Sequence, residues 1–227
     1  MPLRRARIVL AAFVLAAALG IPSGPAAAGP NENAKFVLHL VPAKKGKKFN
    51  CLTPGAKIAS EVVTRGELGE EYIAYVLITD YIPEEGITGL QFGISYDEAE
   101  GSGADILGWQ HCTLYEWPMD GWPAANTGNL LTWHQDDDCQ RSIPLVVGYF
   151  TVTAASADRL KIIPRPVDGL ARVAACGLNN VNAPERLDNI KIENLGWVDF
   201  GENAGYNPWD PAQNLLMLQK QFKTRKD

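Results

Sequence analysis

The sequence predicts an all-β protein, an antiparallel β-sandwich of about nine strands followed by a short C-terminal helix. Apolar and polar residues alternate in strand-length runs along most of the chain. Between these runs lie turn segments rich in Gly, Pro, Asn and Asp, residues that favour chain reversal. Long stretches of helical periodicity are nearly absent, so a parallel sheet with crossover helices is disfavoured.

The N-terminus has the features of a cleavable signal peptide, residues 1–28. A short basic segment, residues 1–7, precedes an uncharged apolar stretch, residues 8–19. That stretch is shorter than the roughly 20 residues of a membrane-spanning helix, and the segment after it contains two prolines. Small residues then predict cleavage after Ala28. We expect secretion to an extracellular or periplasmic location without membrane insertion; the alternative is a buried N-terminal helix.

We expect one β-sandwich domain over residues 29–211 and a helix and tail over residues 212–227. Asp210 and Pro211 have the residue types of a helix N-cap and first turn. The predicted strands are residues 35–41, 72–80, 87–96, 105–111, 130–135, 144–154, 159–164, 170–175 and 191–200. The predicted core consists of Phe36, Leu38, Ile73, Tyr75, Leu77, Leu90, Phe92, Ile94, Leu107, Val147, Tyr149 and Ile162.

The charge of the chain argues against nucleic-acid binding. The formal net charge is −5 and becomes −8 without the three leader arginines. Phosphate contacts need clustered Lys and Arg. The only such cluster, residues 44–48, has the composition of a solvated loop.

Four cysteines in an exported chain predict two disulfides. Three pairings are possible, and we expect Cys51 with Cys176 and Cys112 with Cys139. The alternative is a metal site formed by His111, Cys112, His134 and Cys139. This set lacks the closely spaced ligand pairs that are typical of zinc sites.

The sequence contains no catalytic motif, so we expect no enzyme. A serine-hydrolase elbow, a P-loop, a dinucleotide fingerprint and a zinc-protease helix are all absent. A glycosidase needs two carboxylates across a cleft. The acids beside aromatic residues have the composition of an exposed loop: Glu116, Asp120, Asp136, Asp137 and Asp138.

Calcium is the more plausible ion, because hard oxygen ligands gather in one glycine-containing turn: Asp97, Glu98, Glu100 and Asp105. Residues 136–138 form a second acidic run. Neither matches a known calcium-loop pattern.

Two of the six tryptophans, Trp117 and Trp122, lie in the loop part of the excursion between Cys112 and Cys139. Large apolar side chains in a loop either pack down as a plug or present a binding platform. In the second case Glu116, Asp120 and Asn126 would orient polar groups of a ligand. Trp109, Trp133 and Trp197 lie in predicted strands and are expected to pack within the sheets.

Three segments carry a resemblance to a known family: residues 73–78 (IAYVLI), 89–97 (GLQFGISYD) and 106–109 (ILGW). Over about Glu71 to Pro164 the chain resembles cohesin-like extracellular bacterial modules. This resemblance implies a jelly-roll β-sandwich with a role in protein–protein contact or carbohydrate-associated assembly. The cysteines, the tryptophan-rich excursion and the aromatic segment 196–209 depart from the family. In these features the chain resembles a group of uncharacterised secreted bacterial proteins, and we do not expect dockerin binding.

Our first hypothesis is a secreted, non-catalytic interaction module, with an extracellular protein or polysaccharide as partner. The alternative is a carbohydrate-binding module that uses the loop tryptophans, and the third is a glycoside-active enzyme. Exposed, coplanar Trp117 and Trp122 would favour sugar. A long exposed sheet face would favour protein, and two inward-facing acids in a deep cleft would indicate an enzyme.

Overall fold

The computed structural model describes residues 29–224 except Lys47, Glu100 and residues 135–137 and 178–185. The predicted signal peptide with its cleavage site, Glu100, Asp136 and Asp137 therefore lie outside the described residues. No helix of the described chain is long and apolar enough to cross a membrane.

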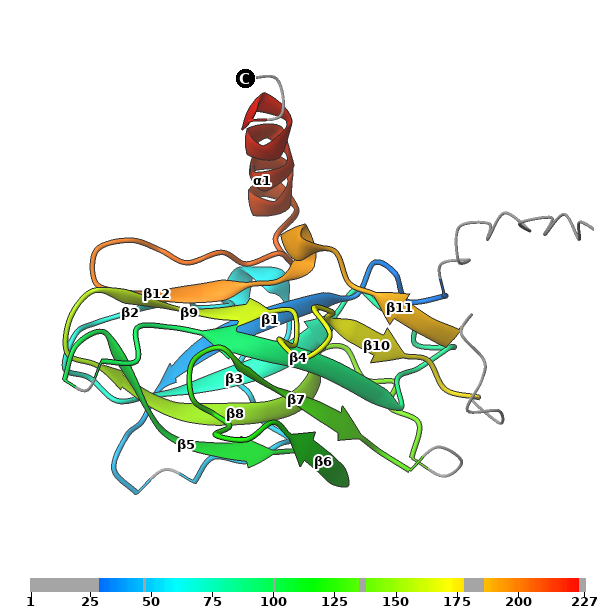
Figure 1. Cartoon of the computed structure of the whole chain (residues 1–227), viewed down its shortest axis with the longest axis horizontal. Helices are drawn as coiled ribbons and strands as arrows, with labels where there is room; N and C mark the ends of the chain where they lie inside the picture. The colour runs from blue at the N-terminus through cyan, green and yellow to red at the C-terminus, as the bar shows by residue number, and fades with distance from the viewer. Residues whose placement is uncertain (1–28, 47, 100, 135–137, 178–185, 225–227) are drawn as a thin grey trace, which may run out of the picture.

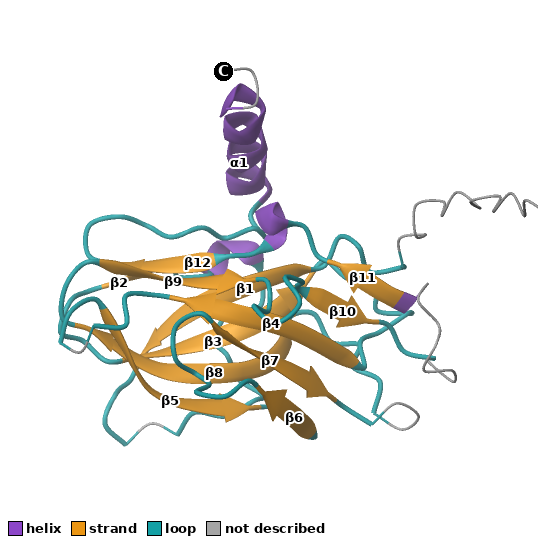
Figure 2. Cartoon of the chain, in the orientation of Figure 1, coloured by secondary structure: helices purple, strands orange, loops and turns teal. Residues whose placement is uncertain are grey.

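Two sheets packed face to face form the body of the molecule, which confirms the predicted β-sandwich (Figures 1 and 2). The first, sheet A, has the order β1 (Lys35–Pro42), β3 (Tyr72–Thr79), β8 (Leu145–Ala154) and β5 (Ala104–His111). All its pairs are antiparallel.

The second, sheet B, is built around β4 (Gly89–Ser95). On one side β4 pairs with β7 (Thr127–Thr132), which pairs with β6 (Tyr115–Pro118). On the other side it pairs with β10 (Arg172–Ala174) and β9 (Asp158–Ile163). The sheet continues to β11 (Leu187–Asn189), β12 (Trp197–Phe200) and β2 (Arg65–Gly66).

Each of the nine predicted strands overlaps a strand of the structure, and the described residues form twelve strands in total. The prediction for residues 191–200 is wrong in its first half, where Ile192–Asn194 is a 3-10 turn and only Trp197–Phe200 is a strand. The three additional strands are β2, β6 and β11, which are two to four residues long. Such short segments carry too few alternating positions to show a strand pattern.

The predicted C-terminal helix is also confirmed, as α1 (Pro211–Thr224). The Asp210 carboxylate accepts a hydrogen bond from the Ala212 amide (2.9 Å), as an N-cap does. The helix stands away from both sheets (Figure 2). Two 3-10 turns, η1 (Ala59–Glu61) and η3 (Ile192–Asn194), lie in the connections.

The space between the sheets holds the main apolar core. It is centred on Phe36, Phe92 and Phe150, all fully buried. A second apolar cluster lies on the outer face of sheet A, where residues 43–64, here called the strap, cover it. This second cluster consists of Val37, Ala56, Ile73, Tyr75, Leu77 and Val146, with Phe49 and Val62 of the strap and Tyr149 packed against it.

The predicted core is therefore divided between two clusters. Ile73, Tyr75 and Leu77 are buried as expected, but beneath the strap and not between the sheets. The prediction for Leu107 is wrong, because its side chain is 57% exposed. The pairing of β5 with β8 shifts between Ile106 and Gly108, and this bulge places Leu107 outside the regular alternation.

The predicted disulfide pairing is wrong. The bonds join Cys51 to Cys112 and Cys139 to Cys176, with Cα–Cα distances of 5.5 and 5.8 Å. Cys112 directly follows β5 of sheet A, where its amide binds the Val147 carbonyl. Cys139 follows β7 of sheet B. The excursion thus crosses from one sheet to the other, so its two ends do not face each other. The rival metal site is excluded by the same bonds, because all four cysteines are oxidised.

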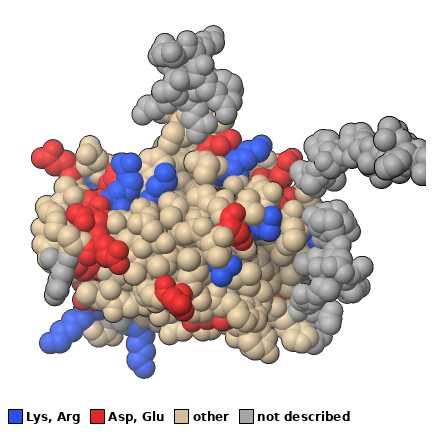
Figure 3. Space-filling model, in the orientation of Figure 1, with Lys and Arg blue, Asp and Glu red and all other residues tan. Residues whose placement is uncertain are grey.

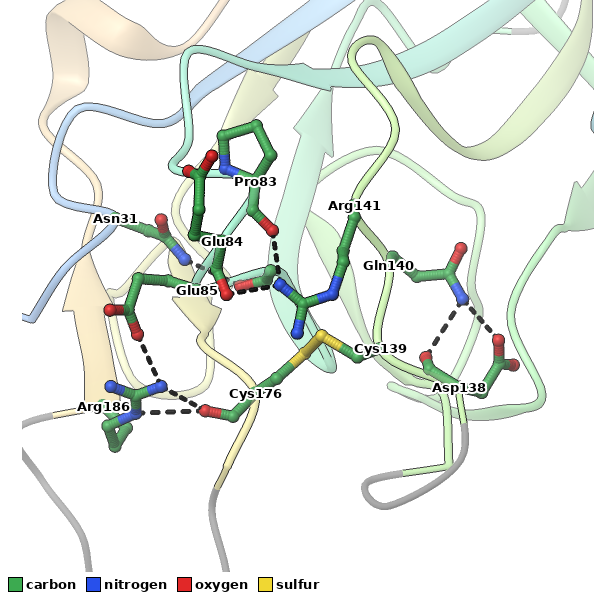
Figure 4. Close-up of a disulfide and its surroundings, with 11 residues drawn as sticks. Asn31, Pro83, Glu84, Glu85, Asp138, Cys139, Gln140, Arg141, Cys176 and Arg186 are labelled. Carbon is green, nitrogen blue, oxygen red and sulfur yellow. Dashed lines mark hydrogen bonds and ion pairs between the residues drawn. A yellow bond between two sulfur atoms is a disulfide. The ribbon is translucent and has the colours of Figure 1, made fainter.

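The Cys139–Cys176 bond lies in a network of polar contacts (Figure 4). Arg141 donates to the carbonyls of Pro83 (2.7 Å) and Glu84. Arg186 forms an ion pair with Glu85 (2.7 Å) and donates to the Cys176 carbonyl. These contacts hold the segment before β4 against the two cysteine-bearing loops.

Gly86 lies directly against this disulfide. Its φ is +62°, and a Cβ atom built there would lie 2.3 Å from the Cys139 Sγ. Both the backbone conformation and the space therefore require glycine at this position.

Candidate functional site

The excursion between Cys112 and Cys139 contains all five predicted ligand-binding residues, and the structure separates them into an inward and an outward set. Part of the excursion forms β6 and β7 at the edge of sheet B. Since side chains of a strand alternate between its faces, Glu116 of β6 points inward while Tyr115 and Trp117 point outward.

Trp122 belongs to the inward set. Its ring lies 5.4 Å from that of Trp109 and 5.7 Å from those of Phe92 and Phe150, measured between centroids. It packs against the main core. Trp122 is thus the loop plug of the two alternatives, and the structure does not bring it onto one surface with Trp117.

Glu116 is also turned inward. Its Oε2 atom accepts hydrogen bonds from the Trp109 Nε1 (3.1 Å) and the Asn129 Nδ2 (2.8 Å). Asn129 is fully buried. Because buried donors need partners, this oxygen satisfies groups of the interior, while the Oε1 atom lies 4.0 Å from the His111 Nε2.

Tyr115 (52% exposed) and Trp117 (51%) of the outward side form an exposed apolar surface, which we call the aromatic patch. The two rings are 6.0 Å apart and tilted by 41°. Asp120 and Asn126, the other predicted residues, are exposed in the turn between β6 and β7. The backbone N–H of Asn126 donates a hydrogen bond to the Ile94 carbonyl (2.8 Å), which fixes this turn on β4.

Other parts of the two outer sheet faces are covered. The strap lies over β1 and β3 of sheet A. On sheet B the turn at residues 165–170 lies over β4, where Gln91 donates to Asp168 (2.7 Å) and Gly93 leaves no room for a Cβ beside Pro166. Figure 3 shows that side chains other than Lys, Arg, Asp and Glu occupy most of the visible face.

A cavity of about 560 Å³ lies beside the Cys51–Cys112 disulfide. Strap residues 51–57 form one wall. The opposite wall consists of Cys112, Trp133, Gln140, Ser142, Pro144, Leu145 and Val146. Among the described residues, this lining contains no Asp or Glu and therefore not the pair of acids that a glycosidase needs.

His39 of β1 lies beneath the strap and forms hydrogen bonds with it. Its Nδ1 accepts a hydrogen bond from the Val63 amide (3.0 Å), and the ring also forms a hydrogen bond with the Pro54 backbone. Burial lowers the pKa of His39 from 6.5 to about 4, against the opposing effect of Glu61. The imidazole is therefore neutral at physiological pH and links the strap to sheet A.

The turn predicted to bind calcium is closed by hydrogen bonds within the protein. The Asp97 carboxylate accepts from the Ala99 amide (3.1 Å), and the Asp158 carboxylate accepts from the Asp97 and Ala104 amides. In the part of the chain that the structure describes, no three His, Cys, Asp or Glu side chains form a metal-binding group. Calcium binding stays a prediction.

Sequence reasoning missed the strap, the cavity and Tyr115 of the aromatic patch. Tyr115 and Trp117 flank Glu116 at strand spacing, and this alternation was the available signal. The cavity has no such signal in the sequence, because its walls come from segments about 60 to 90 residues apart.

No protein-family model matches this chain, and no curated protein matches it either. Solved structures similar to it include several cohesin modules. The cohesin module of a family 33 glycoside hydrolase from Clostridium perfringens is 11% identical, with a TM-score of 0.41 over 74% of this chain and 99% of the module. The sixth cohesin of scaffoldin B from Acetivibrio cellulolyticus, in complex with the Cel5 dockerin, is 10% identical, with a TM-score of 0.43 over the same shares. The third ScaB cohesin of R. flavefaciens, in complex with a group 1 dockerin, is 15% identical, with a TM-score of 0.38 over 61% of this chain and 92% of that one. Cohesins are the family that the sequence motifs indicated.

Proposed function

We propose that this protein is a secreted, non-catalytic module that binds another protein through the aromatic patch on β6. The observation that carries the proposal is the patch itself, two adjacent aromatic side chains that are each about half exposed. Exposed apolar side chains that lie together, in contrast to ones scattered singly, are a feature of interaction sites. Tyr and Trp are also the residue types enriched at the energetic centres of interfaces.

The setting of the patch supports this role. It lies on a strand paired with β7, three to five residues after Cys112 of the Cys51–Cys112 disulfide. A rigid base reduces the conformational entropy that is lost when a partner binds. The sequence resemblance to cohesin-like modules, which implies protein–protein contact, points in the same direction.

An extracellular location is supported by the cysteines. All four are in disulfides, and such bonds persist in oxidising compartments. The predicted signal peptide would direct the chain there.

Carbohydrate binding is the second candidate, because two exposed rings lie side by side. A flat sugar surface is best matched by coplanar rings. Here Trp122 is turned inward and the remaining pair, Tyr115 and Trp117, is tilted by 41°. This geometry favours an irregular protein surface over a sugar.

The proposal can be tested by photo-crosslinking in cultures of the producing organism. A benzophenone amino acid replaces Trp117 in one variant and Val167 in a control, since Val167 is similarly exposed (63%) but lies in the turn over β4. We expect a discrete crosslinked protein from position 117 and none from position 167. With that partner purified, the double variant Tyr115→Ala, Trp117→Ala should bind at least about a hundredfold more weakly.

The melting temperature of the double variant should stay close to that of the original protein. Equal crosslinking at both positions, or an unchanged affinity, would contradict the proposal. Retention on polysaccharides that depends on Tyr115 and Trp117, without a protein partner, would establish the carbohydrate alternative.

A further inference from the structure

We infer that cleavage of the leader completes the fold, because the new α-ammonium group of Gly29 forms a buried ion pair with the carboxylate of Asp188. The inference uses the predicted cleavage between Ala28 and Gly29. It goes beyond the proposed function, since neither partner of the ion pair belongs to the aromatic patch. Asp188 thereby becomes the acceptor site for the N-terminus of the exported protein.

Asp188 of β11 is a buried acid whose carboxylate is only partly satisfied. The residue is 1% exposed, and its Oδ2 atom accepts a hydrogen bond from the backbone N–H of Asn31 (2.7 Å). Its Oδ1 atom is also buried and has no hydrogen-bond partner among the described residues. Because a buried acceptor without a partner lowers stability and a buried charge needs a counter-charge, this site favours a cationic donor at Oδ1.

The charged side chains near Asp188 do not supply that donor. Burial raises the pKa of Asp188, and the negative charge of Glu32 acts in the same direction. In the described chain, Arg186 is the cation that lowers this pKa, and its effect is the weakest of those that act on the carboxylate. Arg186 is already paired with Glu85 (2.7 Å). A full positive charge directly at the carboxylate is therefore still missing.

Gly29 lies directly against this carboxylate. It is buried, and a Cβ atom built on it would lie 2.7 Å from the Oδ2 and 2.8 Å from the Oδ1 of Asp188. This close approach requires glycine at the position. Since the nitrogen is attached to the same Cα atom, it lies within about 5 Å of Oδ1, and the N–H of Gly29 already lowers the pKa of Asp188. At such a separation an opposite charge favours the ionised carboxylate.

Hydrolysis of the peptide bond between Ala28 and Gly29 changes the group at this position from a neutral amide to a cation. One water molecule is consumed: its oxygen becomes part of the Ala28 carboxylate, and its two hydrogens convert the N–H of Gly29 to NH₃⁺ at neutral pH. The ammonium has three donors where the amide has one, so it can bond Oδ1 while Asn31 keeps its bond to Oδ2. Because the leader is removed during export, cleavage precedes the burial of Gly29.

The ion pair would connect three parts of the structure. Asn31 donates from its Nδ2 atom to the Gly86 carbonyl (2.9 Å) and accepts at its Oδ1 atom from the Ile82 amide (2.9 Å). Figure 4 shows Asn31 beside this segment, which precedes β4 and lies against the disulfide. Processing would thus fasten the N-terminus, β11 and the segment before β4 to one another.

The test compares two forms of the protein, both with the two disulfides formed. One begins at Gly29 and the other at Ala28, and each is released from an N-terminal fusion by a protease that cleaves directly before its first residue. Both forms are also made with Asp188→Asn, which removes the charge and keeps the shape of the side chain. Mass spectrometry of the protein exported with its own leader establishes the natural N-terminus, which we expect to be Gly29.

We expect the additional residue to raise the equilibrium constant for unfolding at pH 7, measured by urea denaturation, at least about tenfold when Asp188 is present. In Asp188→Asn the same extension should change this constant less than about threefold. The α-amine of Gly29 should also be protected. An N-hydroxysuccinimide acetyl ester at pH 7 should modify it at least about tenfold more slowly in the original protein than in Asp188→Asn, as followed by the mass of the N-terminal peptide.

A pH comparison of the two unsubstituted forms keeps the test independent of whether Asp188→Asn folds. Pairing raises the pKa of the α-ammonium group above its unfolded value of about 7.7. Its contribution to stability is therefore present below that pH and is lost as the pH rises through the folded pKa. The difference between the two forms should shrink from tenfold at pH 7 to less than about threefold at pH 10. Charges common to both forms, including those of Glu32 and Arg186, cancel in this comparison.

Several outcomes would overturn the inference. A natural N-terminus other than Gly29 would do so. An equal effect of the extension with and without the Asp188 carboxylate, or a difference that persists at pH 10, would show that the extension acts through its bulk. Rapid acetylation of Gly29 in the original protein would show that its amine is not paired. None of these results alters the crosslink expected at position 117, so this inference and the proposed function can fail separately.

Discussion

Replacing Trp122 by Ala should destabilise the protein strongly, whereas replacing Trp117 by Ala should not. Both tryptophans lie in the same excursion, but Trp122 contacts three aromatic rings of the core at 5.4 to 5.7 Å. Trp117 is 51% exposed. Truncation of a fully buried Trp costs about 3–5 kcal/mol. Since Trp122 is only partly buried, we expect about 3 kcal/mol for Trp122→Ala and at most about 0.5 kcal/mol for Trp117→Ala.

The free energies of unfolding can be measured by urea denaturation followed by far-UV circular dichroism, a signal that does not depend on the removed indole. For a domain of this size, 3 kcal/mol corresponds to a decrease of roughly 6–12 °C in melting temperature. Trp122→Phe should recover part of the loss, because it retains an aromatic ring in the same site. Equal destabilisation by the two alanine variants, or a loss below about 1 kcal/mol for Trp122→Ala, would refute the assignment of Trp122 as the plug.

Three further predictions follow from the strap and the disulfides. Burial lowers the pKa of His39 from 6.5 to about 4, so the unfolded chain binds a proton at this imidazole more tightly than the folded protein does. The free energy of unfolding should therefore fall by on the order of 3 kcal/mol as the pH decreases from about 6.5 to about 4. His39→Gln should remove that dependence in urea titrations across this range, and an identical pH profile would contradict it. Gly86→Ala should cost more than Gly169→Ala, since both glycines have positive φ but only Gly86 faces a disulfide sulfur; we expect a difference of at least about 1 kcal/mol in thermal or urea unfolding, and equal losses would show that space is not limiting at Gly86. A non-reduced digest should yield peptides joined through Cys51–Cys112 and Cys139–Cys176, and a Cys51–Cys176 peptide would show that the structure is wrong here.

The positions of the long strands could be predicted because their signal is local. Residues 89–95 alternate between small or polar and apolar side chains, and β4 turns Leu90, Phe92 and Ile94 into the core. The signal for the helix was equally local, since Asp210 and Pro211 define the start of the helix. The same reasoning failed for Leu107, because a bulge changes the face of a residue without changing the sequence pattern around it.

The candidate site depended on contacts between distant segments. From the sequence, Trp117 and Trp122 were equivalent loop residues. The structure distinguishes them, because pairing of β6 with β7 turns Trp117 outward, while the following turn returns Trp122 to the core. The alternation around Glu116 was visible in the sequence, but it became informative only when β6 was known to be a strand.

The sequence by itself determined the fold class, the strands long enough to show alternation, the helix start and the expectation of two disulfides. Only the tertiary structure decided which cysteines pair, that the strap covers the outer face of sheet A, and that a cavity lies beside the Cys51–Cys112 bond. The physical reason is that period and capping are properties of neighbouring residues, whereas pairing and burial depend on which sheet each segment joins. Cys112 and Cys139 bound one excursion in the sequence, but they follow strands of different sheets, so each finds its partner in a distant part of the chain.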